Sequence, residues 1–329
     1  MENFINNANI FLVFLLLVAG FVLLIKGADF FVEGSSSVAK RLHVPSIIIG
    51  LTIVAMGTSL PETAVSVSAS LAGNNELAVS NVVGSNIFNM MVVIGVCSLL
   101  QTVHVDRQSI VRDIPFSAIC ALLLLGFGWF GFADRANMTL GHLDGIILLV
   151  LFAGFILFLV RQAMNASKAG KEQANEEEIK LIPVWKSLVF IVGGAAAIAV
   201  GGDLTVDSAS RIASELGMSQ NLIGLTIVSI GTSLPELVTS IVAAKKNEVD
   251  MALGNAIGSN VFNILMVLGI ASAISPIAFI MENVIDIAIL LVFTLIVWLF
   301  AATKKKIGKF EGLCMLLLYA GFAAYIIIR

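Results

Sequence analysis

The sequence has few charged residues and few residues that bind soft metals. Asp, Glu, Lys and Arg make up 12% of the 329 residues, against about a quarter in typical soluble domains. The net charge of -3 includes no basic block, which argues against nucleic-acid binding. The three histidines lack the close spacing of a zinc site. The three cysteines lie in apolar runs, which suggests buried thiols and argues against disulfides.

Hydrophobic residues, in contrast, make up 58% of the chain. A water-soluble core cannot hide so much apolar surface, so we expect an all-α integral membrane protein in a lipid bilayer. A helix needs about 20 apolar residues to cross the bilayer, and ten runs of suitable length are present. The predicted spans cover residues 10–31, 47–71, 77–100, 113–132, 141–160, 184–208, 221–245, 251–275, 284–302 and 308–328.

Two stretches of the chain occur twice. GLTIVAMGTSLPE at 50–62 is nearly identical to GLTIVSIGTSLPE at 224–236, and NVVGSNIFN at 81–89 returns as NAIGSNVFN at 255–263. The offset is 174 residues in both cases. Because five predicted spans separate the copies, the second copy must cross the membrane in the opposite direction. The sequence therefore predicts two inverted repeats of five helices each.

The repeats define the expected domains and their orientation. We expect an N-terminal repeat at 1–160, a polar cytoplasmic linker at 161–183 and a C-terminal repeat at 184–329. Fifteen of the 19 Lys and Arg residues follow spans 1, 3, 5, 7 and 9. Positive residues favour the cytoplasmic side, which predicts a multi-pass protein of the cell membrane with both termini outside. Lys26 lies inside the first predicted span, where it could snorkel or face Asp29.

The repeated motif places a proline and a glutamate in the middle of an apolar run. In water, Ser59-Leu60-Pro61-Glu62 would be an ordinary helix start. At mid-membrane, however, a helix start means an interrupted span, because Pro61 cannot donate to the carbonyl of Gly57. We therefore expect helices 2 and 7 to be broken, each into two half-helices.

A buried carboxylate at that depth needs a partner. The broken spans contain no intramembrane Lys or Arg that could neutralise Glu62 or Glu236, so a mobile cation is the natural counter-charge. The carbonyls freed at each break also suit a cation. These carbonyls belong to residues 55–58 and 229–232.

Spans 3 and 8 carry polar residues spaced by four, which lie on one helix face. Small and amide side chains on such a face often serve only to pack helices. Because these stripes are duplicated beside broken spans, we assign part of each stripe to the cation site. The residues assigned to the site are Ser85, Asn89, Ser259 and Asn263, whereas Asn81, Asn86, Asn255 and Asn260 are assigned to helix packing.

The available ligands favour a hard cation. Glu62 and Glu236, both bidentate, would supply four oxygens, and the carbonyls of Thr58 and Thr232 would supply two more. Calcium accepts about six to eight oxygens with flexible geometry, whereas magnesium requires a stricter octahedron. Soft transition metals would require Cys or His. Calcium and sodium remain.

The paired GTSLPE and GSNxFN motifs resemble the repeats of the cation/calcium exchanger superfamily, most closely its prokaryotic sodium/calcium antiporters. The resemblance implies a calcium site between Glu62 and Glu236, with Thr58 and Thr232 as carbonyl donors. It also implies flanking sodium sites that use Ser59, Ser233, Ser85, Ser259 and backbone oxygens of Ala55 and Ser229. Some relatives carry Asp where this chain has Asn263, so the resemblance leaves the ion stoichiometry open.

The expected function is therefore exchange of sodium for calcium by alternating access. We expect no enzymatic activity, no cofactor and a functional monomer. The alternative is a calcium/proton antiporter, although that branch typically shows a Gly-Asn-x-x-Glu pattern. A passive cation channel is less favoured, because channels usually build acidic rings from several chains and this chain supplies its own pair of acids.

Overall fold

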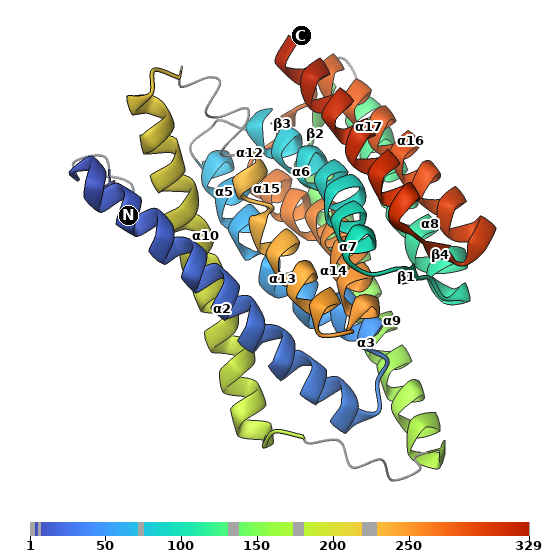
Figure 1. Ribbon diagram of the computed structural model, residues 1–329. Coiled ribbons are helices and arrows are strands. Elements are labelled where there is room, and N and C mark those ends of the chain that lie inside the picture. The colour runs from blue at the N-terminus through green and yellow to red at the C-terminus, as the bar shows by residue number, and fades with distance from the viewer. Residues whose placement is uncertain are drawn as a thin grey trace.

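The computed structural model describes residues 4–5, 8–71, 76–130, 138–173, 181–218 and 229–328. Its architecture is helical throughout these residues, with only four two-residue strands (Figure 1). The first part of the chain forms α2 (Ile10–Leu42), α3 (Ser46–Ile49), the π-helix η1 (Gly50–Val54), α4 (Ala55–Thr58), α5 (Leu60–Leu71), α6 (Glu76–Phe88), the π-helix η2 (Asn89–Val93), α7 (Ile94–Leu100), β1 (Val103–His104), the π-helix η3 (Ser109–Asp113), α8 (Ile114–Phe130), β2 (Thr139–Leu140) and α9 (His142–Gln173).

The second part follows a similar order of elements. It comprises α10 (Val184–Glu215), α12 (Ser229–Gly231), α13 (Leu234–Lys245), α14 (Val249–Phe262), the π-helix η5 (Asn263–Val267), α15 (Leu268–Ile274), β3 (Ile277–Ala278), α16 (Met281–Lys304), β4 (Lys306–Ile307) and α17 (Lys309–Ile328). In Figure 1, α2 begins and α17 ends at the upper side of the view, whereas α9 ends and α10 begins at the lower side.

Among the described residues, eight helices are long and apolar enough to cross a membrane, or nine if the bent pair around Ser59 counts as one span. This confirms the expectation of an all-α membrane protein. Three helices are longer than expected. Helix α2 continues to Leu42, α10 continues to Glu215, and α9 extends through residue 173 into the stretch expected to be linker. The core of that stretch, 174–180, lies outside the described residues.

Two central assemblies carry the polar stripes. In the most apolar windows of the α6–η2–α7 and α14–η5–α15 spans, 83% and 78% of the residues are buried, against 22% to 39% in the other continuous spans. Burial on all sides indicates a helix enclosed by protein. The outer helices instead expose large apolar side chains such as Phe11, Val150 and Leu317. Apolar residues thus cover the outside, while polar residues gather within, as a bilayer requires.

Helices α2 and α10 pack against each other through glycines at one side of the molecule (Figure 1). A Cβ added to Gly27 would lie 2.9 Å from Ala197 Cβ, and one added to Gly194 would lie 2.8 Å from the carbonyl oxygen of Gly27. Gly20 and Gly201 show the same reciprocal contact. Small residues allow membrane helices to approach closely. An apolar cavity of about 260 Å³, lined by residues of α2, α10, α12 and α13, lies beside this pair.

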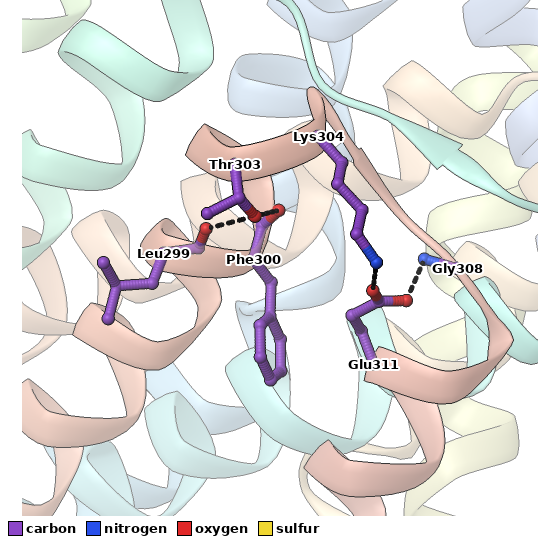
Figure 2. A network of polar contacts seen from close by, with 6 residues as sticks. All are labelled: Leu299, Phe300, Thr303, Lys304, Gly308 and Glu311. Carbon is purple, nitrogen blue, oxygen red and sulfur yellow. Dashed lines mark hydrogen bonds and ion pairs between the residues drawn. The ribbon is translucent and has the colours of Figure 1, made fainter.

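Two short antiparallel strand pairs join the two halves of the chain. Strand β1 pairs with β4, and β2 pairs with β3, near opposite ends of the molecule (Figure 1). The turn after α16 is further fixed by Glu311, which accepts hydrogen bonds from Lys304 Nζ at 2.9 Å and from the Gly308 amide at 3.1 Å (Figure 2). The outer helices α16 and α17 are thereby tied to the α7–α8 connection.

Ion pairs connect α2 to the turn between α13 and α14. Lys246 Nζ lies 2.7 Å from an Asp29 oxygen and 3.8 Å from Glu33, and Lys40 lies 3.3 Å from Glu248. Asp29 therefore pairs with Lys246, and Lys26 is an exposed residue of α2.

Glu248 is the best-connected acid of this turn. Burial raises the pKa of Glu248, but the hydrogen bond from Ser46 and the charge of Lys40 outweigh burial, so its pKa lies below the ordinary value. The bond from Ser46 Oγ measures 2.7 Å. Since Ser46 begins α3, this carboxylate joins the start of the first bent span to the start of α14.

Candidate cation-binding site

The first predicted break falls between α4 and α5. Helix α4 ends at Thr58, Ser59 has φ -83° and ψ 8°, and α5 begins at Leu60. The two parts are bent by 44°. Gly57 lies just before the bend. The ring of Phe31 in α2 packs against it, so that an added Cβ would be 2.5 Å from Phe31 Cζ. Pro61, together with Gly57 packed against Phe31, thus accounts for the bend.

A similar arrangement occurs between α12 and α13. Helix α12 ends at Gly231, Thr232 and Ser233 form a turn, and α13 begins at Leu234. A Cβ added to Gly231 would collide with Val206 of α10. Residues 221–228, which begin the predicted seventh span, lie outside the described residues. Among the described residues, the motif therefore forms a turn between two helical segments.

The two glutamates meet between the repeats. Glu62 in α5 and Glu236 in α13 are both fully buried, and each lies within the electrostatic field of the other. Glu236 Oε1 accepts hydrogen bonds from Ser59 Oγ at 3.1 Å and Ser259 Oγ at 3.4 Å. Within the described part of the chain, no donor meets hydrogen-bond geometry with either oxygen of Glu62 or with Glu236 Oε2. Three carboxylate oxygens are therefore left without a protein donor.

The stripe residues lie in the protein interior, and Ser259 among them contacts Glu236. Ser85, Asn89, Ser259 and Asn263 are all buried, and Ser233 Oγ donates to Ser85 Oγ at 2.9 Å. Among the described residues, both amide atoms of Asn89 and the Oδ1 of Asn263 lack a hydrogen-bond partner. Each of these two asparagines begins a π-helix, η2 or η5, and π-helical turns frequently mark functional sites.

The predicted backbone donors lie at the same breaks. Ala55 begins α4, and its carbonyl oxygen accepts a hydrogen bond from the Ser59 amide at 3.0 Å. The same oxygen also lies 3.3 Å from Thr58 Oγ1, so two groups of the break donate to it. Ser229 begins α12 at the equivalent position of the second copy.

The side chains of the candidate site bear mainly oxygen atoms and no sulfur or imidazole nitrogen. Buried polar atoms without partners cost about 1–3 kcal/mol each, and charged groups cost more, so a cluster of such oxygens calls for a counter-charge. No group of three or more His, Cys, Asp and Glu side chains that could hold a metal occurs among the described residues. The cluster combines two carboxylates with hydroxyl and amide groups. Such ligands suit a hard cation.

Two of the asparagines assigned to packing have that role. Asn86 Nδ2 donates to the Asn260 carbonyl oxygen, and Asn260 Nδ2 donates to the Asn86 carbonyl oxygen, both at 3.1 Å. The other two differ. Asn255 accepts a hydrogen bond from Thr58 Oγ1 at 3.0 Å, and Asn81 accepts one from Thr232 Oγ1 at 3.4 Å. In the sequence, only the position of Asn255 and Asn81 in the same polar stripes pointed to these contacts with Thr58 and Thr232.

Known proteins share the sequence and fold of this chain. The family model described as sodium/calcium exchanger protein matches residues 12–161 and 186–328. The sodium/calcium exchanger MaX1 of Methanosarcina acetivorans is 30% identical over 94% of this chain and 97% of its own length. The inner membrane protein YrbG of Escherichia coli (strain K12) is 32% identical over 86% of this chain and 88% of its own length.

This chain is also similar to solved structures of a sodium-calcium exchanger. A structure of the sodium-calcium exchanger NCX_Mj soaked with 10 mM Na⁺ and zero Ca²⁺ covers 96% of this chain and 99% of its own, with a TM-score of 0.82 and 33% sequence identity. The family match extends over both copies of the GTSLPE motif. The chain therefore belongs to the sodium/calcium exchanger family.

Proposed function

We propose that this protein is an antiporter that exchanges sodium for calcium across the membrane. The observation that supports this most strongly is the pair of fully buried, interacting carboxylates of Glu62 and Glu236, which retain three oxygens without a protein donor. Calcium would lie between these two acids. The relative MaX1 is named a sodium/calcium exchanger, and NCX_Mj was soaked with sodium and strontium ions.

Sodium sites are proposed around this centre. The hydroxyls and amides that line it are more numerous than a pair of acids alone would need, and a sodium ion needs a cage of oxygens, whereas a proton does not. The groups proposed to serve calcium or sodium are Glu62, Glu236, Thr58, Thr232, Ser59, Ser233, Ser85, Ser259, Asn89, Asn263 and the backbone oxygens of Ala55 and Ser229.

The proposed architecture is ten spans in two inverted repeats. Several contacts support it because they recur at the offset of 174 residues, as in the reciprocal bonds of Asn86 and Asn260. The end of α9 and the start of α10 lie at the side opposite to the start of α2 and the end of α17 (Figure 1). With the Lys and Arg distribution, this favours a cytoplasmic linker and extracytoplasmic termini.

Transport in liposomes tests the proposal. Purified protein in liposomes loaded with sodium chloride should accumulate calcium after dilution into sodium-free buffer. Liposomes with equal sodium on both sides and protein-free liposomes serve as controls, and both should show little uptake. A second arm replaces the sodium gradient with a pH gradient.

The outcomes separate the three candidate functions. Uptake that requires outward-directed sodium supports exchange. Equal uptake driven by a pH gradient in the absence of sodium would assign the protein to the calcium/proton antiporters. Uptake that needs no counter-gradient would make it a channel.

A further inference from the structure

Two amides that are not proposed ligands, one buried and one half-buried, connect the breaks to the opposite repeat. Asn255 lies in α14, fully buried, and Asn81 lies in α6. Asn255 contacts Thr58, which ends α4. Asn81 contacts Thr232, which directly follows α12. The backbone carbonyls of these threonines are proposed calcium ligands, so this inference rests on the proposed function.

Asn255 bridges three segments. Its Oδ1 accepts from Thr58 Oγ1 at 3.0 Å, while its Nδ2 donates to the backbone oxygen of Glu236 at 3.3 Å and to Ser240 Oγ at 3.0 Å. Thr58 belongs to the first copy, whereas Glu236 and Ser240 belong to the second. One amide thus joins the break of one repeat to the helix that carries the acid of the other.

The orientation of this amide follows from its partners. The backbone oxygen of Glu236 can only accept, so the Nδ2 of Asn255 must face it. Its Oδ1 therefore faces Thr58, whose hydroxyl must donate. The same hydroxyl also lies 3.2 and 3.3 Å from the carbonyl oxygens of Val54 and Ala55, the acceptors that threonine usually uses in a helix. The bond to Asn255 is the shortest of the three.

The second copy repeats the arrangement. Thr232 Oγ1 donates to Asn81 Oδ1 at 3.4 Å, and Asn81 Nδ2 donates to Ser66 Oγ at 3.3 Å. Ser66 stands at the position equivalent to Ser240, since the two differ by the repeat offset. The same three-residue connection therefore forms twice, each time between a break and the opposite repeat.

We propose that Asn255 and Asn81 are positioning residues that hold Thr58 and Thr232 in the geometry required for calcium binding. Backbone at a break is less constrained than in a helix, because Pro61 already removes one helical hydrogen bond. A carbonyl ligand there needs support from its neighbours. Groups that orient metal ligands are typically worth about 10- to 100-fold in metal affinity.

Equilibrium calcium binding tests the proposal. Calcium chloride is titrated into purified protein in detergent, with the wild type measured first. Asn255→Ala should bind calcium about 10- to 100-fold more weakly. The matched control is Asn283→Ala, since Asn283 is also buried and also joins the two halves, through Ser80 Oγ at 3.2 Å, but does not contact the site. Its calcium affinity should stay within about twofold of wild type.

A double-mutant cycle tests whether Asn255 acts through Thr58. Thr58→Val removes the hydroxyl and keeps the carbonyl. The double variant should lose less affinity than the product of the two single losses, because the second change removes a bond that is already broken. If Asn255→Ala does not yield monodisperse protein, Asn81→Ala with Thr232→Val provides the same cycle at the other break.

Three results would overturn the proposal. They are an asparagine variant at the break that binds calcium within about twofold of wild type, an equal loss in Asn283→Ala, or strictly multiplicative effects in the cycle. Failure of the wild-type protein to bind calcium would instead refute the proposed function, and this would be known before any variant is measured.

Discussion

Replacing one buried acid by its amide should separate calcium binding from folding. Glu62→Gln keeps the volume of the side chain but removes its charge. Glu62 is fully buried, and neither of its oxygens has a donor in hydrogen-bond geometry among the described residues, so a bound cation is the expected counter-charge. A role as a helix cap would predict loss of stability, whereas a role as a cation ligand predicts loss of binding.

The magnitude follows from the cost of breaking a buried charge pair. Removing one partner of such a pair costs about 3–5 kcal/mol, and each 1.4 kcal/mol is about tenfold in affinity. Calcium should therefore bind about two to three and a half orders of magnitude more weakly. The ion-free protein should not lose stability, because the substitution removes one of two buried acids that repel each other electrostatically. Its thermal midpoint in chelator should equal or exceed that of wild type.

Two measurements check these expectations. Calcium titration gives the affinity, and thermal unfolding in chelator at neutral and alkaline pH gives the stability. Glu236→Gln serves as the comparison, since Glu236 Oε1 accepts bonds from Ser59 and Ser259 and its substitution should give a smaller gain in stability. Wild-type calcium affinity in Glu62→Gln, or a large fall in its thermal midpoint in chelator, would refute the reasoning.

Other parts of the structure lead to further expected outcomes. A reporter placed after residue 173 should be active in its cytoplasmic form, and one after Arg329 in its extracytoplasmic form; the reverse result would refute the proposed topology. Gly27→Leu should destabilise the protein by more than about 1 kcal/mol in thermal unfolding, because the added Cβ alone would lie 2.9 Å from atoms of α10. The pKa of Glu248 is lowered. Its hydrogen bond with Ser46 should therefore stabilise the fold at pH values above the ordinary carboxyl pKa, and this stabilisation should be lost as the pH falls through the lowered pKa of Glu248. Glu248→Gln should therefore reduce thermal stability near pH 7 and make less difference in acid.

The sequence predicted most of the apolar spans because these depend on local chemistry. Apolar runs determined most helices, and Pro61 with Gly57 indicated the bend that the structure places at Ser59. Helix ends were harder to predict. Helix α2 continues beyond the apolar run through Ser35, Ser36 and Ser37, which are buried, since these small residues face protein and not lipid.

The parts of the site that depend on contacts between the repeats could not be predicted. The sequence identified the acids and the stripes, but gave Asn255 the same packing role as Asn260. Only the spatial arrangement shows that Asn255 meets Thr58, almost 200 residues away, while Asn260 meets the backbone of Asn86. In the same way, the sequence offered Lys26 as a partner for Asp29, but the structure brings Lys246 to Asp29 from a distant turn.

The two ends of α2 are held against the rest of the molecule by different forces. Towards its C-terminal end, Asp29 and Lys40 form ion pairs in partly exposed surroundings, and such pairs are weak and screened by salt. Towards its N-terminal end, Phe21 borders the apolar cavity instead. Any separation of α2 from the turn between α13 and α14 would therefore depend on ionic strength, whereas separation at Phe21 would depend on how readily lipid tails or water fill apolar space.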